Sequence, residues 1–183
     1  MKKKMILITA LLLVAFLAFL PLFIITKNGA LEGVTITLGI TLYHFVMRLA
    51  VGYIVNSIMK NKANHNSFWF KEKRFEKKLY KLLRVRKWKK HLPTYSPEAF
   101  DITQKNVAEI IGATCQAEIV HEIITVLSLL PITLIPFLGG AVAFILTSIL
   151  AALVDCLFVI LQRYNRPRLI KTLVRAKKVN KPE

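Results

Sequence analysis

Residues 5–26 read MILITALLLVAFLAFLPLFIIT, an apolar run of 22 residues without a single charge. A helix of about 20 apolar residues is long enough to cross the hydrocarbon core of a bilayer. A secretory signal peptide has a shorter apolar core of roughly 7–15 residues, followed by a small-residue cleavage site that this stretch lacks. We therefore predict that residues 5–26 form a retained transmembrane helix in an all-α integral membrane protein.

Three further stretches are long and apolar enough to be membrane spans, at about residues 33–59, 118–138 and 141–161. A short polar loop, KNGALE at residues 27–32, separates the first two spans. Gly139 and Gly140 predict a tight turn between the last two, and Pro131 and Pro136 are expected to bend or end the first arm of that hairpin.

Between the second and third spans, residues 60–117 are polar and strongly basic. Apolar side chains recur there with a helical rhythm, at Phe75, Leu79, Leu82 and Leu83. This pattern predicts an amphipathic helix over residues 71–90 that lies at the cytoplasmic face of the membrane. A basic tail at residues 162–183 completes what we predict to be a single membrane domain, residues 1–183.

The chain combines a hydrophobic fraction of 55% with a net charge of +17, which is rare in soluble domains. The positive charge points to anionic lipid headgroups as partners. It does not indicate nucleic acid, because the basic segment is tethered between membrane spans. Basic residues lie in the N-terminus, the central segment and the tail, so the positive-inside rule predicts a multi-pass protein of the cell membrane with both termini cytoplasmic.

Ionisable residues within the spans are few. His44 and Arg48 are four residues apart and share a helix face, and Asp155 lies in the cytoplasmic half of the fourth span, as Arg48 does in the second. An ion pair between Arg48 and Asp155 is therefore possible. The sequence leaves open whether it is a structural bridge or serves a function.

Glu118 and His121 are three residues apart and share a helix face, next to Glu122. A carboxylate beside an imidazole can orient the ring and raise its basicity, which suits removal of a proton from a sugar hydroxyl. The alternative is a polar cap where the third span enters the membrane. One histidine and two carboxylates are weak evidence for a metal, so we predict no metal site.

No cofactor is predicted either. The sequence has no P-loop, no dinucleotide-binding glycine motif and no G-x-S-x-G nucleophile motif. Cys115 and Cys156 lie in or beside apolar stretches and are interpreted as small buried residues.

Three stretches resemble the glycosyl-4,4'-diaponeurosporenoate acyltransferase family, small bacterial membrane proteins of staphyloxanthin-type carotenoid synthesis. They lie in the family's order over roughly the C-terminal 100 residues. The stretches are Val85-Arg86-Lys87-Trp88-Lys89 with Leu92-Pro93, Ala117-Glu118-Ile119-Val120-His121 with Leu130-Pro131, and Gln162-Arg163-Tyr164-Asn165-Arg166-Pro167-Arg168-Leu169.

The resemblance implies transfer of a fatty acyl group from a donor to a sugar hydroxyl of a glycosylated carotenoid or a related glycolipid. On the matching positions, we expect His121 to act as general base and Glu118 as its orienting partner. Substrate-binding residues would be Arg163, Asn165, Arg166 and Arg168, which suit an anionic or polar group, together with Lys87, Trp88 and Lys89 at the membrane surface.

Two observations keep other functions open. The family pattern has an aromatic residue after the histidine, where this chain has Glu122, and this difference indicates a more polar site. A basic interfacial segment would also serve a non-enzymatic lipid-binding or scaffold protein, or another lipid-modifying enzyme.

Overall fold

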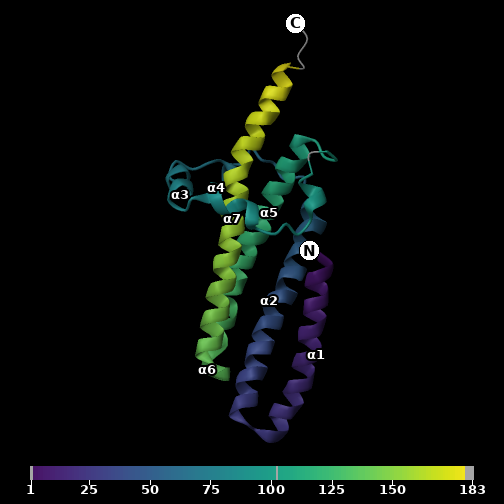
Figure 1. The fold of residues 1–183 in the computed structure, drawn as a ribbon, viewed down its shortest axis with the longest axis vertical. Coiled ribbons are helices and arrows are strands. Elements are labelled where there is room, and N and C mark those ends of the chain that lie inside the picture. The colour runs from purple at the N-terminus through teal and green to yellow at the C-terminus, as the bar shows by residue number, and fades with distance from the viewer. Residues whose placement is uncertain (1, 102, 180–183) are drawn as a thin grey trace. The chain divides into compact units, whose positions relative to one another are not determined.

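The computed structural model describes residues 2–101 and 103–179, and this part of the chain forms helices and turns but no strand (Figure 1). Its long helices are α1 (Lys2–Thr26), α2 (Gly29–Met59), α5 (Val107–Ser128) and α7 (Ala141–Val179). The short ones are η1 (Phe68–Phe70), α3 (Glu76–Leu82), α4 (Val85–Trp88), η2 (Lys89–His91), η3 (Pro97–Ala99), η4 (Leu130–Leu134) and α6 (Ile135–Leu138).

Four helical stretches are long and apolar enough to cross a membrane, at residues 2–26, 29–59, 107–138 and 141–175. The predicted all-α class with four spans is therefore confirmed. The chain comprises two compact units, residues 1–53 with 123–155 and residues 54–122 with 156–183. Their boundaries fall inside α2, α5 and α7, so each of these helices contributes to both units.

In the first unit, α1 and α2 lie side by side and are joined by a turn (Figure 1). The turn is shorter than the predicted loop 27–32, because the Asn28 side chain accepts a hydrogen bond of 2.8 Å from the backbone N–H of Ala30 and α2 begins at once. Gly39 lets α2 approach α1 closely, since a Cβ atom there would lie 3.0 Å from the ring of Phe16. Most apolar side chains of α1 are exposed, as expected of a helix that faces lipid.

The α6–α7 turn of the first unit agrees with the prediction for residues 131–140. Gly139 and Gly140 have φ of 65° and 60°, values that favour glycine. Helix α5 ends at Ser128 before the two prolines, and η4 and α6 carry the chain to the turn. The hydroxyl of Tyr43 on α2 donates a 2.9 Å hydrogen bond to the carbonyl of Leu127 on α5.

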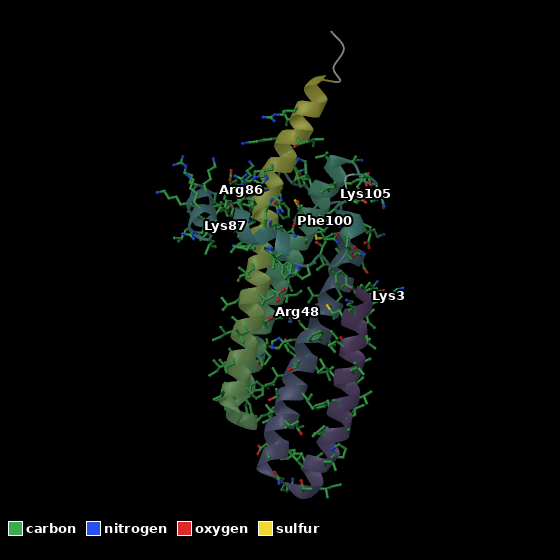
Figure 2. The ribbon with its side chains drawn as sticks, viewed as in Figure 1. Lys3, Arg48, Arg86, Lys87, Phe100 and Lys105 are labelled. Atoms are coloured by element: carbon green, nitrogen blue, oxygen red, sulfur yellow. The ribbon has the colours of Figure 1, made fainter. Side chains whose placement is uncertain are left out.

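Arg48 on α2 (Figure 2) forms an ion pair with Asp155 on α7, which the sequence left as a possibility, and it also donates to the carbonyls of His44 and Ala151. The Asp155 side chain is 2% exposed and that of Arg48 is 20% exposed. Burial of a charge in an apolar helical unit requires such a partner. The pair therefore bridges α2 and α7.

The second unit corrects two predicted boundaries and extends a third. The helix predicted over residues 71–90 is divided into α3 and α4, because Arg84 adopts the left-handed conformation with φ of 50°. The predicted third span belongs to a longer helical stretch, since α5 begins at Val107, after Asn106 accepts a hydrogen bond from the backbone N–H of Glu109. The basic segment after residue 161 is not a separate tail in the described residues, since α7 continues as far as Val179.

Candidate active site

The centre of the second unit is a buried carboxylate held by two arginines. Glu118 on α5 is fully buried, and each of its carboxylate oxygens accepts a hydrogen bond from a different guanidinium. Arg163 donates to Oε1 at 2.5 Å and Arg166 donates to Oε2. Arg163 and Arg166 are three residues apart on α7 and therefore project from the same face of the helix.

The same arginines hold a loop that crosses this face. Arg163 donates to the carbonyls of Trp69 and Lys71, both at 3.2 Å, and Arg166 donates at 3.0 Å to the carbonyl of Phe70. The guanidinium of Arg166 also lies 4.8 Å from the centre of the Phe70 ring. The fork of donors on each arginine thus joins α5, α7 and the η1 segment, which a lysine could not do.

Glu76, on the first turn of α3, is the second acid of the network. Arg163 pairs with its carboxylate at 2.6 Å, and Tyr80 donates to the other oxygen at 2.8 Å. The burial of Tyr80, followed by its hydrogen bond to the negative Glu76, raises the pKa of the phenol well above its ordinary range. Two arginines and two glutamates cancel in charge, which reduces the desolvation penalty of this interior site.

An aromatic cluster extends the network toward the surface. The rings of Tyr80 and Tyr164 meet edge to face, with centroids 5.3 Å apart. Val85 is fully buried with them, and Trp88 and Ile160 pack against the cluster. This packing fixes α3 and α4 against α7.

His121 lies one turn after Glu118 on α5, half-buried, and its ring stacks on Phe158 of α7 with centroids 4.6 Å apart. Glu122 accepts a 2.9 Å hydrogen bond from the indole of Trp69. Both carboxylate oxygens of Glu118 accept hydrogen bonds from arginines. Glu118 therefore belongs to the arginine network, in addition to the role expected from the sequence, which is to orient His121. The general-base role of His121 stays a prediction.

The remaining predicted substrate-binding residues gather beside Tyr164. Lys89 donates to the side chain of Asn165 at 3.2 Å and lies 5.1 Å from the centre of the Tyr164 ring. Arg168 lies 3.6 Å from that ring centre and donates to the Tyr164 carbonyl. Burial, and then the positive charges of Arg168 and Arg86, lower the pKa of Lys89.

Lys87 is exposed on α4, whereas the half-buried Trp88 donates a 2.8 Å hydrogen bond to the Leu83 carbonyl. The network thus separates the eight-residue block at 162–169 into two parts. Arg166 is buried, Arg163 is partly buried with its side chain 15% exposed, and both bind protein acceptors, while Arg168 and Asn165 lie with Lys89 around Tyr164.

Sequence reasoning missed Glu76, Tyr80 and Phe158. Glu76 carried a usable signal, because it is one of few acids in a basic stretch and needs a partner. Phe158 carried none, since it is one apolar residue among many in its span. The site also has a supporting contact at Gly112 on α5, where a Cβ atom would lie 2.1 Å from the carbonyl oxygen of Asn61.

Among residues 2–101 and 103–179, no group of three histidine, cysteine, aspartate or glutamate side chains could hold a metal ion. In comparisons with known proteins, the family model described as glycosyl-4,4'-diaponeurosporenoate acyltransferase matches residues 66–175. No curated protein matches the chain, and neither does any solved structure. The matched range contains every residue of the network just described, from Trp69 to Arg168.

Proposed function

Because the chain belongs to the glycosyl-4,4'-diaponeurosporenoate acyltransferase family, we propose that it transfers a fatty acyl group to a sugar hydroxyl of a glycosylated carotenoid or related glycolipid in the cell membrane. The family implies an acyltransferase of carotenoid biosynthesis. One observation carries the proposal: the matched range coincides with the segment that contains His121 and the arginine network.

In the proposed reaction, His121 is the general base. Its imidazole takes the proton of the sugar hydroxyl while the hydroxyl oxygen bonds to the carbonyl carbon of an activated acyl donor. The bond between that carbon and the donor's leaving group then breaks, and the leaving group departs with the proton. The stack on Phe158 restricts rotation of the ring, which favours a defined direction for the reacting nitrogen.

The other residues divide into two roles. Glu118, Arg163 and Arg166 are positioning residues that hold α5, α7 and the η1 segment around His121. Lys87, Trp88, Lys89, Asn165 and Arg168 are proposed to contact the donor, the acceptor or anionic headgroups at the membrane surface. The three lysines that precede the first apolar run support a topology with both termini cytoplasmic.

The test replaces His121 by alanine and by phenylalanine, since phenylalanine preserves a ring that can stack on Phe158. Both variants are expected to lose acyl transfer, measured by mass spectrometry of lipids extracted from expressing cells. The matched control is His91→Ala, an exposed histidine of the same unit, which is expected to retain activity. Normal product from His121→Phe would overturn the proposed role of His121.

A further inference from the structure

A hollow of about 640 Å³ opens on the second unit beside the aromatic cluster. Its walls are the α3–α4 segment, where Figure 2 shows Arg86 and Lys87, and the part of α7 that carries Tyr164 and Pro167. Seven basic residues line it, namely Lys77, Lys81, Arg84, Arg86 and Lys87 of the first wall with Arg168 and Lys171 of α7.

The charges of this hollow differ from those of the arginine network. Arg163 and Arg166 are matched by two buried glutamates, whereas the lining of the hollow includes a single acid, Glu72. The carboxylate of Glu72 lies 3.8 Å from the ammonium group of Lys77 and compensates one positive charge, which leaves an excess of six positive charges. The pKa of Lys89 is lowered first by burial and then by the positive charges of Arg168 and Arg86, and this second cause reflects the same crowding of cations.

The shape and chemistry of the hollow suit a particular class of ligand. Its volume falls within the range of about 300–1,000 Å³ that is usual for small-molecule sites, and it exceeds what one phosphate fills. Tyr164 supplies an aromatic surface, with the guanidinium of Arg168 3.6 Å from the ring centre. Arginine forks bind phosphate oxygens in pairs, and the aliphatic stems of the lysines offer apolar contact.

We propose that this hollow binds the phosphate groups of the acyl donor. Two sources have the required chemistry: a nucleotide-linked acyl thioester that enters from the aqueous side, and a phospholipid of the bilayer. Either one brings negative charge to the six uncompensated cations and carries an acyl group that can be transferred. The inference rests on the proposed function, because it names the donor class for that reaction.

The test compares two triple variants of equal charge change. The hollow variant combines Lys81→Gln, Arg86→Gln and Lys87→Gln. The control variant combines Arg74→Gln, Lys78→Gln and Lys90→Gln, which lie in the same segment outside the hollow lining. All six side chains are exposed, so both proteins are expected to fold, and equal thermal unfolding midpoints would verify this.

The first arm titrates coenzyme A into the full-length protein in phosphatidylcholine nanodiscs. A soluble donor is supported if the affinity for coenzyme A falls by about tenfold or more in the hollow variant and by about threefold or less in the control variant. The second arm measures phosphatidylglycerol enrichment among copurified lipids. A phospholipid donor is supported if the wild-type protein does not bind coenzyme A and if phosphatidylglycerol enrichment is lost in the hollow variant but kept in the control variant. Equal behaviour of the two triple variants in both arms would overturn the proposal.

The site and the reaction fail in distinguishable ways. If the wild-type protein transfers acyl groups and the hollow variant has an unchanged KM for the donor, the reaction stands and the hollow is not the donor site. If the wild-type protein binds coenzyme A through the hollow but forms no acylated lipid in the presence of acyl-coenzyme A and glycolipid, the phosphate site stands and the reaction is wrong.

Discussion

Arg166 and Glu118 form an ion pair in which both side chains are almost completely buried, 1% and 0% exposed. A buried charge that loses its partner is strongly destabilising, whereas an exposed pair contributes little. This difference makes the pair a sensitive probe of what holds the second unit together.

Glu118→Gln is expected to destabilise the protein by about 3–5 kcal/mol, because the buried guanidinium of Arg166 and the partly buried guanidinium of Arg163 lose their shared anion. The measurement is thermal or denaturant unfolding in a mild detergent. Glu109→Gln is the matched control on the same helix, since Glu109 is 49% exposed, and its partners are the exposed Lys105 and the side chain of Asn106. Its effect is expected below about 1 kcal/mol. Similar losses in the two variants would show that the network does not stabilise the unit.

Arg163→Lys tests the hydrogen bonds of the guanidinium apart from its charge. A lysine can pair with Glu76 or Glu118, but it cannot also reach the carbonyls of Trp69 and Lys71. Faster amide hydrogen exchange is therefore expected over residues 68–76. Arg175→Lys, an exposed position on the same helix, is expected to leave that exchange unchanged. Unchanged exchange in Arg163→Lys would show that the carbonyl contacts do not hold the loop.

The spans and their turns could be predicted from the sequence because both depend on local properties. The run of 22 uncharged residues requires a membrane helix, and Gly139 with Gly140 requires a turn. The Arg48–Asp155 pair could be anticipated as well, since charged residues are so few within the spans that each has few possible partners.

The interior of the second unit could not be predicted in the same way. Arg163, Arg166 and Arg168 look alike in the sequence, and only the fold brings Glu76 and Glu118 to the first two. The break of the amphipathic helix depends on the left-handed backbone of Arg84, a residue type that gives no sign of it. The continuation of α7 over residues 162–179 could not be predicted either, because Pro167 and the basic residues give no sign that the helix extends beyond its apolar part.

Gly112→Ala is expected to destabilise the second unit by about 1–3 kcal/mol, because the added Cβ atom would lie 2.1 Å from the backbone carbonyl oxygen of Asn61. A backbone cannot yield as a flexible side chain does. Gly52→Ala in α2 is the control: its Cβ meets nothing within 4 Å, so the higher helix propensity of alanine should stabilise the protein by up to about 1 kcal/mol. Opposite shifts of the unfolding midpoint would verify the close approach, and equal shifts would contradict it.

Asp155→Asn is expected to cost about 3 kcal/mol or more, since Arg48 would keep its charge within an apolar helical unit. Replacing both residues at once, as Arg48→Met with Asp155→Leu, is expected to recover most of that loss because no charge remains to be paired. The free energies of unfolding of the wild type, the two single variants and the double variant, measured in mild detergent, form a double-mutant cycle. A double variant as unstable as Asp155→Asn would indicate that the two residues do more than pair with each other.

The lowered pKa of Lys89 predicts a pH dependence of stability with a definite sign. Below its folded-state pKa, Lys89 is protonated in both states, and the folded state bears the full cost of burying this charge near Arg168 and Arg86. As the pH rises through the folded-state pKa toward the unfolded-state value, the folded protein releases the proton first and that cost disappears.

The stability of the wild-type protein relative to Lys89→Gln is therefore expected to improve as the pH is raised from about 8 to about 10. The measurement is the unfolding midpoint of each protein in mild detergent at several pH values. Lys90→Gln, at the exposed neighbouring position, corrects for effects of pH that are common to the segment. A wild-type advantage that falls over this range would mean that the bond to Asn165 stabilises the charged lysine more than burial and its cationic neighbours disfavour it.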